Sequence, residues 1–562
     1  MKKGFTLIEL LAVIIILAII ALIATPAILK VVDNAKESAN KSSIAGYADA
    51  VKLYVVEEQF KNNGSYPSSI DDSKIGTNVN NVVCAEIIYT KSGVLLGSCK
   101  IGDKDMAYWY SNGIVTTSKP DNYDELKLNV LTKKLVLADK SGASSPVLAS
   151  NMIPIMYYNN SWVKADSSNL EGTYSWYDYS TKKWANAVTV TSSTLDSYKS
   201  ASVGTIINEN DILTYLVWIP RYKYLIPAGT GARTISITFE DKNTSKSTGD
   251  AVTTYLTHPA FTFDGERSGF WVGKFEATGT ISNITVKPNT PSLINQNVSS
   301  FFTAMRNMEV TDNIYSFNSS EVDTHMMKNS EWGVVAYLSM STYGINNEIY
   351  KNNSSSYYTG RSGGNVGDSQ IKYYGNEYIS TGFYSYDGKC ATTASIANGI
   401  DSNCTSTDNY VSDLSLAYNA STTGTIYGVY DMSGGANEFV MGNYNNYSGY
   451  STTQNSGFTG PTGYDSGTYT GINFPDSKYY NIYKGLTAVT ACNGGVCFGD
   501  ALSETSGWYG DSSSTISGIY PWFMRGGYCY STSSVGIFSF GSSNGNVHSD
   551  RSARLVVFTG DN

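Results

Sequence analysis

The first residue with distinctive chemistry is Glu9, a single acid in an otherwise apolar stretch. The chain opens Met1-Lys2-Lys3-Gly4-Phe5-Thr6-Leu7-Ile8-Glu9 and stays apolar from Leu10 to Leu29. As a helix, this stretch would be about 30 Å long, the thickness of one bilayer core. An unpaired carboxylate at that depth costs roughly 2.5–3.5 kcal/mol. We therefore expect Glu9 to have a function that offsets this cost.

The best candidate for a cleavage site, Gly4, precedes the apolar stretch. An ordinary secretory signal has its small-residue cleavage site after the apolar stretch. The two lysines before Gly4 favour retention of the extreme N-terminus on the cytoplasmic side. We therefore expect cleavage to leave the apolar helix, residues 5–29, on the mature protein.

This pattern of a basic leader (residues 1–4), Gly-Phe-Thr-Leu-Ile-Glu and an apolar helix resembles the type IV prepilin family. The resemblance implies that prepilin peptidase cuts between Gly4 and Phe5 and that Phe5 becomes the methylated N-terminus. It also implies that Glu9 pairs with the new amine on Phe5 of a neighbouring subunit. Pseudopilins of type II secretion and competence systems share the pattern, so a pseudopilin is an alternative to a pilin.

The cysteines favour disulfide bonds over metal chemistry. Seven are present, and six of them form three local pairs, with Cys529 left over. Short loops between cysteines suit disulfides formed outside the cytoplasm, and no pair has the CxxC spacing of zinc or thioredoxin sites. Free buried cysteines are the alternative. The expected pairs are Cys84 with Cys99, Cys390 with Cys404, and Cys492 with Cys497.

Composition argues against nucleic acid as a partner. The 562 residues carry a net charge of −9, and no stripe of Lys and Arg is present. A phosphate-binding surface needs such a concentration of positive charge. The chain has 44 tyrosines, which is an unusually large number. Tyr is favoured where proteins recognise other molecules, so the composition favours a binding function.

The pattern along the chain predicts an α+β protein of several domains. A long helix should continue past residue 29, with an apolar stripe at Ile44, Ala48, Val51 and Val55 that packs on a small antiparallel sheet. We expect strands at 82–90, 93–99, 107–116 and 127–137. A Ser- and Gly-rich stretch then marks a boundary. The expected parts are a pilin head at 30–138, a linker at 139–151, a small β module at 152–210 and a larger domain at 211–562.

The larger domain carries a second resemblance. The segments at 216–221 and 269–278, the block Gly428-Val429-Tyr430-Asp431-Met432-Ser433-Gly434-Gly435-Ala436-Asn437-Glu438-Phe439-Val440, Arg525-Gly526-Gly527 and Arg554-Leu555-Val556-Val557 resemble ordered blocks of the formylglycine-generating-enzyme (sulfatase-modifying-factor) family. That resemblance implies a mostly irregular C-type-lectin-like fold. Independently of it, we expect Trp218, Trp271, Trp332 and Trp522 to form the core and 331–338 to be a helix.

The sequence does not favour catalysis. Activity in the resembled family depends on two copper-binding cysteines after Arg-Gly-Gly, whereas here Cys529 stands alone. The three histidines have no ligand-like partner nearby in sequence, and no GxSxG, P-loop or HExxH motif is present. We therefore expect no catalytic residue, no metal and no cofactor, and a surface enzyme of the formylglycine-generating type is the weakest alternative.

The segment between Arg525 and Arg554 has the composition of an adaptable binding surface. Framework residues alternate there with Tyr, Ser, Asn, Asp, His and Gly. The segment also resembles the variable segment of diversity-generating-retroelement proteins, which implies that its side chains vary. A polar loop with no partner is the alternative. We call this segment the C-terminal strip, and its expected ligand-binding residues are Tyr528, Tyr530, Ser533, Phe540, Asn544, Asn546, His548 and Asp550.

Together these features predict a pilin-like subunit, minor or decorated, that carries a non-catalytic binding domain for adhesion. Its expected partners are prepilin peptidase, other pilin subunits and an unidentified protein or glycan ligand. We expect it to be a single-pass protein of the cytoplasmic membrane before assembly, and to lie at the cell surface or in a pilus afterwards.

Overall fold

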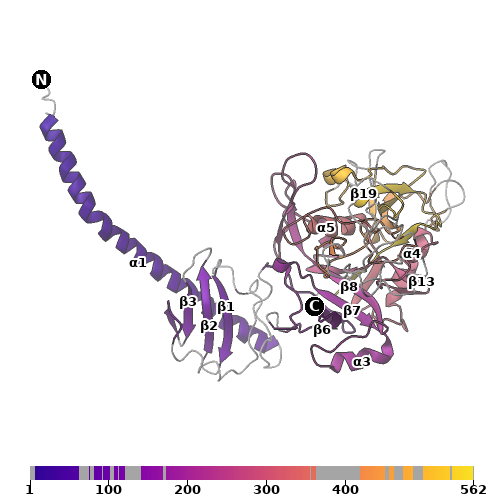
Figure 1. Ribbon diagram of the computed structural model, residues 1–562, viewed down its shortest axis with the longest axis horizontal. Coiled ribbons are helices and arrows are strands. Elements are labelled where there is room, and N and C mark those ends of the chain that lie inside the picture. The colour runs from indigo at the N-terminus through magenta and orange to yellow at the C-terminus, as the bar shows by residue number, and fades with distance from the viewer. Residues whose placement is uncertain are drawn as a thin grey trace, which may run out of the picture. The chain divides into compact units, whose positions relative to one another are not determined.

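The computed structural model of the chain divides into two compact units, Met1–Ala138 and Asp139–Asn562 (Figure 1). The structure describes residues 7–61, 75, 82–90, 93–101, 107–111, 113–120, 141–168, 172–352, 354, 356–361, 418–449, 455–460, 473–484, 498–531 and 535–560.

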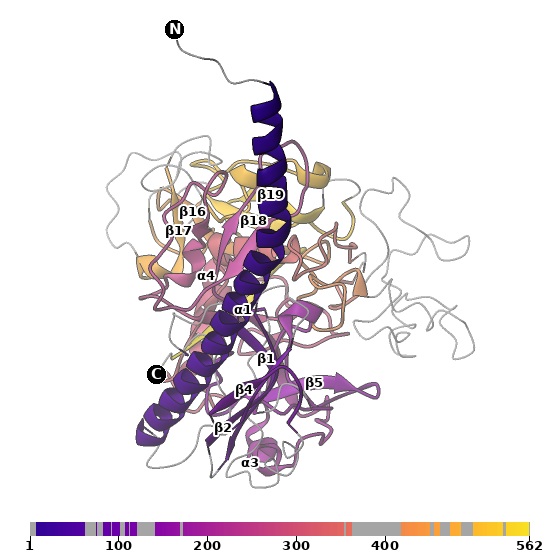
Figure 2. The ribbon, with the colours of Figure 1, turned by 90° about the vertical axis from the view of Figure 1, so that its left-hand side faces the viewer.

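The first unit is a long helix with a small sheet packed on its C-terminal half. Helix α1 spans Leu7–Lys61, and the sheet has the strand order β1-β2-β3-β4 (Figure 2). The predicted apolar stripe is confirmed, because Ile44, Ala48, Val51 and Val55 are fully buried. They form one core with strand residues such as Ile87, as the spacing of four, three and four residues requires of one helix face.

The strands of this sheet correct one prediction. Strands β1 (Val82–Thr90) and β2 (Gly93–Ile101) lie where expected, but 107–116 is two strands, β3 (Tyr108–Ser111) and β4 (Ile114–Thr116). The chain reverses at Gly113, whose φ of 84° suits a residue without a Cβ. The Asn-Gly pair at 112–113 is a hairpin signal that the prediction missed. The strand expected at 127–137 lies outside the described residues.

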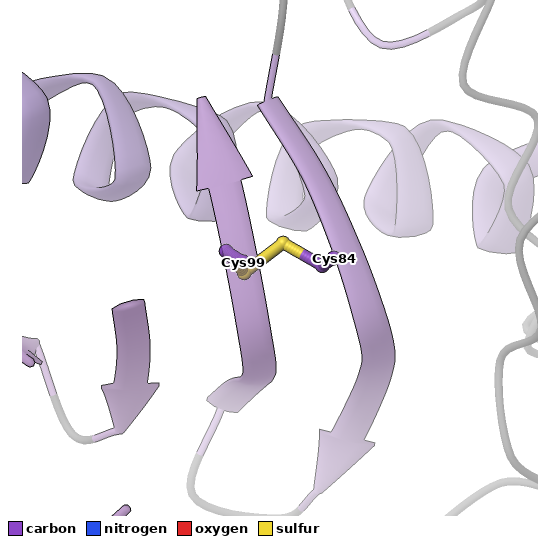
Figure 3. The surroundings of a disulfide bond; sticks show 2 residues. All are labelled: Cys84 and Cys99. Atoms are coloured by element: carbon purple, nitrogen blue, oxygen red, sulfur yellow. A yellow bond between two sulfur atoms is a disulfide. The ribbon is translucent and has the colours of Figure 1, made fainter. Parts of the chain in front are cut away.

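A disulfide joins the first two strands, as predicted. Cys84 and Cys99 face each other in the antiparallel pairing of β1 with β2, and their sulfurs are bonded (Figure 3). Both cysteines are fully buried in the core between the sheet and α1. The other two predicted pairs, Cys390 with Cys404 and Cys492 with Cys497, lie outside the described residues.

The second unit contains an antiparallel sheet whose strand order in space differs from the order along the chain. In the described residues its strand order is β15-β21-β12-β8-β7-β5-β6. Three of these strands come from residues 152–210, which we expected to be a separate β module. That prediction is wrong, because β7 pairs with β8 along five residue pairs, from Asn186 with Val217 to Val190 with Ile212. The strands are β5 (Ile153–Tyr158), β6 (Ser161–Lys164), β7 (Asn186–Val190), β8 (Ile212–Pro220), β12 (Gly269–Gly273), β15 (Val322–Met326) and β21 (Leu555–Thr559).

A second sheet of this unit carries the C-terminal strip. Its order is β17-β16-β18-β19, and β20 also pairs with β16. The strands are β16 (Asn437–Tyr444), β17 (Asn481–Tyr483), β18 (Trp522–Gly526), β19 (Gly536–Ser543) and β20 (Arg551–Ala553). Smaller pairings involve β9 (Tyr222–Leu225), β10 (Ser236–Phe239), β11 (Leu256–Thr257), β13 (Thr278–Thr280) and β14 (Asn283–Thr285).

Three α-helices complete the described part of this unit: α3 (Ser192–Ser200), α4 (Val298–Arg306) and α5 (Asn329–Ser339). Helix α5 confirms the helix expected at 331–338. Short 3-10 helices lie at Tyr179–Thr181, Pro259–Phe261, Asn307–Glu309, Ser477–Tyr479, Ser503–Thr505 and Trp508–Gly510.

The core of the second unit is rich in aromatic residues and also contains buried charges. The four predicted core tryptophans, Trp218, Trp271, Trp332 and Trp522, are all fully buried. Gly434 adopts a left-handed conformation, with a φ of 79°, and a Cβ there would lie 2.3 Å from the carbonyl oxygen of Asn352. The family-like block around it therefore depends on a residue without a side chain.

Candidate functional site

The N-terminal candidate site begins before the described residues. Helix α1 starts at Leu7, so Gly4 and Phe5 lie outside the described part of the chain. The backbone of Glu9 belongs to the first turn of α1, but its side chain is not among those described. The structure therefore places Glu9 on a helix, and its pairing with the amine of Phe5 of a neighbouring subunit stays a prediction.

The helix that follows leaves its apolar side chains uncovered. Ile14, Ile15, Ile16 and Leu17 are consecutive, and each is more than half exposed. Four consecutive residues point to all sides of a helix, so this surface has no polar face. A surface of this kind is stabilised by other apolar groups, either lipid or neighbouring helices. Among the described residues, no helix combines the length and hydropathy needed to cross a bilayer.

Comparison with protein families gives a match at the N-terminus. Residues 1–25 match the prokaryotic N-terminal methylation motif. The chain has a prepilin-like N-terminus. The motif implies processing by prepilin peptidase, assembly with pilin-like subunits and a membrane-anchored precursor. A search of curated proteins finds no match to the chain.

The other candidate site of this prepilin-like protein is the C-terminal strip, where two tyrosines lie together. The rings of Tyr528 and Tyr530 are 6.1 Å apart, edge to face, and Tyr530 is 51% exposed. The half-buried Tyr357 lies near four groups of the strip that affect its pKa: Tyr528, Cys529, Tyr530 and Asp550. Burial raises the pKa of Tyr357 first, and these neighbours add to the rise. Tyr357 was missed from the sequence because it lies far from the strip along the chain.

The far end of the strip is a loop stabilised by its own side chains. The Asn546 side-chain oxygen accepts a hydrogen bond from Nη1 of Arg551 at 3.0 Å, and that same nitrogen donates to Ser543 at 2.6 Å. Nδ1 of the exposed His548 contacts the Asp550 carboxylate. The structure therefore brings His548 and Asp550 together, whereas the hydrogen-bonding capacity of Asn546 is partly used within the loop.

Phe540 corrects the predicted binding face. It is 1% exposed and its ring lies 6.2 Å from that of Phe523, so it belongs to the core. The residues before it in β19, Ile537 to Ser539, are buried as well, so both faces of this part of the strand are covered. Asn544 is half-buried, next to Gly545 at the end of β19. Ser533 lies outside the described residues. The described face is thus formed by Tyr528, Tyr530, His548 and Asp550, with Tyr357 added.

Two candidate reactive residues are buried. Cys529 is 3% exposed, and burial raises the pKa of its thiol to about 12. It is therefore a neutral thiol at physiological pH, which is a poor nucleophile and metal ligand. His258 is fully buried, and burial lowers the pKa of its imidazole to about 3.

Sequence reasoning also missed a buried carboxyl cluster inside the family-like blocks. Glu276, Asp431 and Glu438 are all at most 3% exposed and lie near Arg554. Burial raises the pKa of Asp431 to about 6 and that of Glu438 to about 7, although Arg554 opposes both shifts. Such shifts are also typical of active sites, but here all three side chains are buried. Within the described residues, no group of three His, Cys, Asp or Glu side chains is placed to hold a metal ion.

Proposed function

We propose that this protein is a pilin-like surface subunit whose second unit, Asp139–Asn562, is a non-catalytic binding domain. The observation that carries the proposal is the methylation motif at residues 1–25, on a helix whose apolar side chains are uncovered and which leads into a separate larger unit. An apolar helix of this kind can pack against its counterparts in a fibre, which leaves the bulky unit outside.

The binding role rests on the chemistry of the C-terminal strip. Tyr528 and Tyr530 supply rigid aromatic area at low entropic cost, and His548 with Asp550 supplies polar groups in the same strip. A ligand for such a face is a protein or a glycan. The lectin-like character of the domain remains part of this proposal and derives from the sequence blocks alone.

The buried state of Cys529 supports a non-catalytic domain. Copper chemistry of the formylglycine-generating type needs two thiolates, whereas Cys529 has a raised pKa and is shielded from solvent. The surface-enzyme alternative would be restored by copper-dependent thiol oxidation in the purified protein that disappears in a Cys529→Ser variant.

Two measurements test the proposal on native cells. Mass spectrometry of the protein should find an N-terminus at Phe5 carrying one methyl group, and immunogold labelling with antibodies against the second unit should decorate intact cells. A protein that still starts at Met1, or a second unit inaccessible from outside, would contradict it. Processing together with blocked secretion or DNA uptake on gene deletion, and no labelled fibre, would favour the pseudopilin alternative.

A further inference from the structure

The second unit has a cleft outside the C-terminal strip, with a volume of about 450 Å³. Five stretches of the described chain border it: the 3-10 helix Pro259–Phe261 with the residues after it, the start of α5, the 3-10 helix Ser477–Tyr479, strand β17 and residues 498–500. None of its lining residues belongs to the strip. Its volume lies in the range of sites for small ligands.

Two lysines in this cleft are held over one aromatic ring. Nζ of Lys328 lies 4.9 Å and Nζ of Lys478 lies 5.2 Å from the centre of the Phe263 ring. Nζ of Lys328 also donates to the carbonyl oxygen of Lys478 at 2.9 Å. The two ammonium groups are therefore positioned by the fold and do not move freely in solvent.

Carboxylates compensate these positive charges. Nζ of Lys478 lies 3.1 Å from Asp264 and 3.5 Å from Asp323, and Nζ of Lys328 lies 3.4 Å from Glu331. A ligand with a net charge would have to compete with these existing pairs. The cleft is therefore polar without a strong preference for either sign of charge.

The remaining lining groups offer both donors and acceptors. The side-chain oxygen of Asn481 accepts from the backbone N–H of Ser330 at 3.1 Å, which turns its NH2 group away from α5. Asp500, whose carboxylate accepts from Tyr483 at 2.6 Å, lines the same cleft. Ammonium and amide groups donate, whereas carboxylates accept. A hydroxyl satisfies both kinds of partner without adding charge, because it donates through its hydrogen and accepts through its oxygen.

We propose that this cleft binds a neutral sugar, with Asp264 and Lys478 at its rim holding adjacent hydroxyls. A hydroxyl can donate to Asp264 while a neighbouring hydroxyl accepts from Lys478, so the ion pair between these residues stays intact. The half-buried Phe498 adds an apolar wall for a face of the sugar ring. A zwitterion, in contrast, would have to separate the ion pair.

The test uses the full-length protein in a detergent without a sugar headgroup, such as lauryldimethylamine oxide. Saturation-transfer NMR and titration would be run with glucose, galactose, mannose, N-acetylglucosamine and maltose, and with glucuronate and glycine as charged comparisons. We expect at least one neutral sugar to bind more tightly than either charged compound. Asp264→Asn and Lys478→Gln should each raise its dissociation constant about tenfold, because each removes one charge-assisted hydrogen bond.

Matched controls are Asp196→Asn and Lys199→Gln on α3, which change the same residue types at exposed positions that do not line the cleft. They should bind sugar like the unaltered protein. The proposal is overturned if no neutral sugar binds, if glucuronate or glycine binds more tightly, or if the two cleft variants bind like the controls. None of these results depends on N-terminal processing, so they are separable from a failure of the proposed surface function.

Discussion

At the scale of single residues, the second unit depends on charges placed where water does not reach. The clearest pair is Arg554 with Glu438, both fully buried, with Nε of the arginine 2.9 Å from a carboxylate oxygen. Arg554 also donates to the carbonyl oxygen of Gly273 at 2.9 Å. The pair therefore connects β16 to the last residue of β12. The pair is tolerated in the core because each partner offsets the free-energy cost of burying the charge of the other.

Replacing Arg554 with Leu should therefore be severely destabilising. The variant leaves Glu438 buried without its partner, and such losses cost about 3–5 kcal/mol. Denaturant unfolding of the full-length protein, followed by tryptophan fluorescence, measures the change. Lys246→Leu, at an exposed position, should lie within about 0.5 kcal/mol of the unaltered protein. An Arg554→Leu variant as stable as this control would contradict the importance of the pair.

His325 makes part of the stability depend on pH. It is fully buried, with Nδ1 2.9 Å from Asp323 and Nε2 3.2 Å from Glu331. Burial alone would lower its pKa, but the carboxylates of Glu331 and Asp323 outweigh burial and the pKa is raised. Tyr479, Lys328, Lys478 and Arg306 surround the same carboxylates.

A histidine with a raised folded-state pKa stabilises the fold below its unfolded-state pKa, and this stabilisation is lost as pH rises through the folded-state pKa. We therefore expect His325→Gln to be most destabilising below the ordinary histidine pKa of about 6.5, with the difference from the unaltered protein shrinking as pH rises. The slope should not exceed about 1.4 kcal/mol per pH unit, since one proton is involved. Unfolding free energies measured at several pH values test this, and a difference that grows with pH would refute it.

At the scale of elements, the disulfide between β1 and β2 should contribute substantially to the stability of the first unit. The bond joins β1 to β2 across a separation of 15 residues, and a loop of that length is stabilised by about 3 kcal/mol in the chain-entropy account. The double variant Cys84→Ala, Cys99→Ala should therefore lower the free energy of unfolding of the first unit by roughly 2–4 kcal/mol. The first unit should then unfold at a lower denaturant concentration.

The matched control is Cys529→Ala, which removes a buried thiol from the other unit. It should leave the unfolding of the first unit unchanged. Hydrogen exchange at the amides of β1 and β2 reports this locally, so a loss of stability in the second unit does not obscure the result. Unchanged protection in the double variant would show that α1 alone holds the two strands.

Local patterns in the sequence predicted individual helices and strands better than they predicted which strands pair with one another. The stripe on α1, strands β1 and β2, helix α5 and the core tryptophans follow from periodicity and residue type. The pairing of β21 with β12 and β15 does not, because strands distant in sequence meet only through tertiary packing. The pairing of β7 with β8 was missed because a boundary was expected between these consecutive strands. The binding face shows the same limit: Tyr528 and Tyr530 were found by composition, whereas Phe540 was assigned to the wrong side and Tyr357 was missed.

At the scale of the whole molecule, function depends on whether the N-terminal helix assembles. An acid in this apolar helix is costly unless a cation neutralises it, and cleavage after Gly4 would create such a cation at Phe5 of the next subunit. In the proposed assembly the second unit supplies neither member of this pair. Processing and incorporation are therefore separable steps, and each depends on a different residue.

Replacing Glu9 with Ala should leave cleavage intact but reduce incorporation into surface polymers at least tenfold, because the partner amine is then buried unpaired. Mass spectrometry of the membrane fraction measures cleavage, and immunoblotting of sheared surface material measures incorporation. The control is Glu37→Ala on the same helix, where the carboxylate lies on the surface 2.6 Å from Nζ of Lys41. An exposed pair of this kind contributes little, so that variant should assemble normally. If Glu9→Ala and Glu37→Ala were incorporated equally, the acid would have no role in assembly, and the exposed apolar side chains of α1 would have to drive the packing alone.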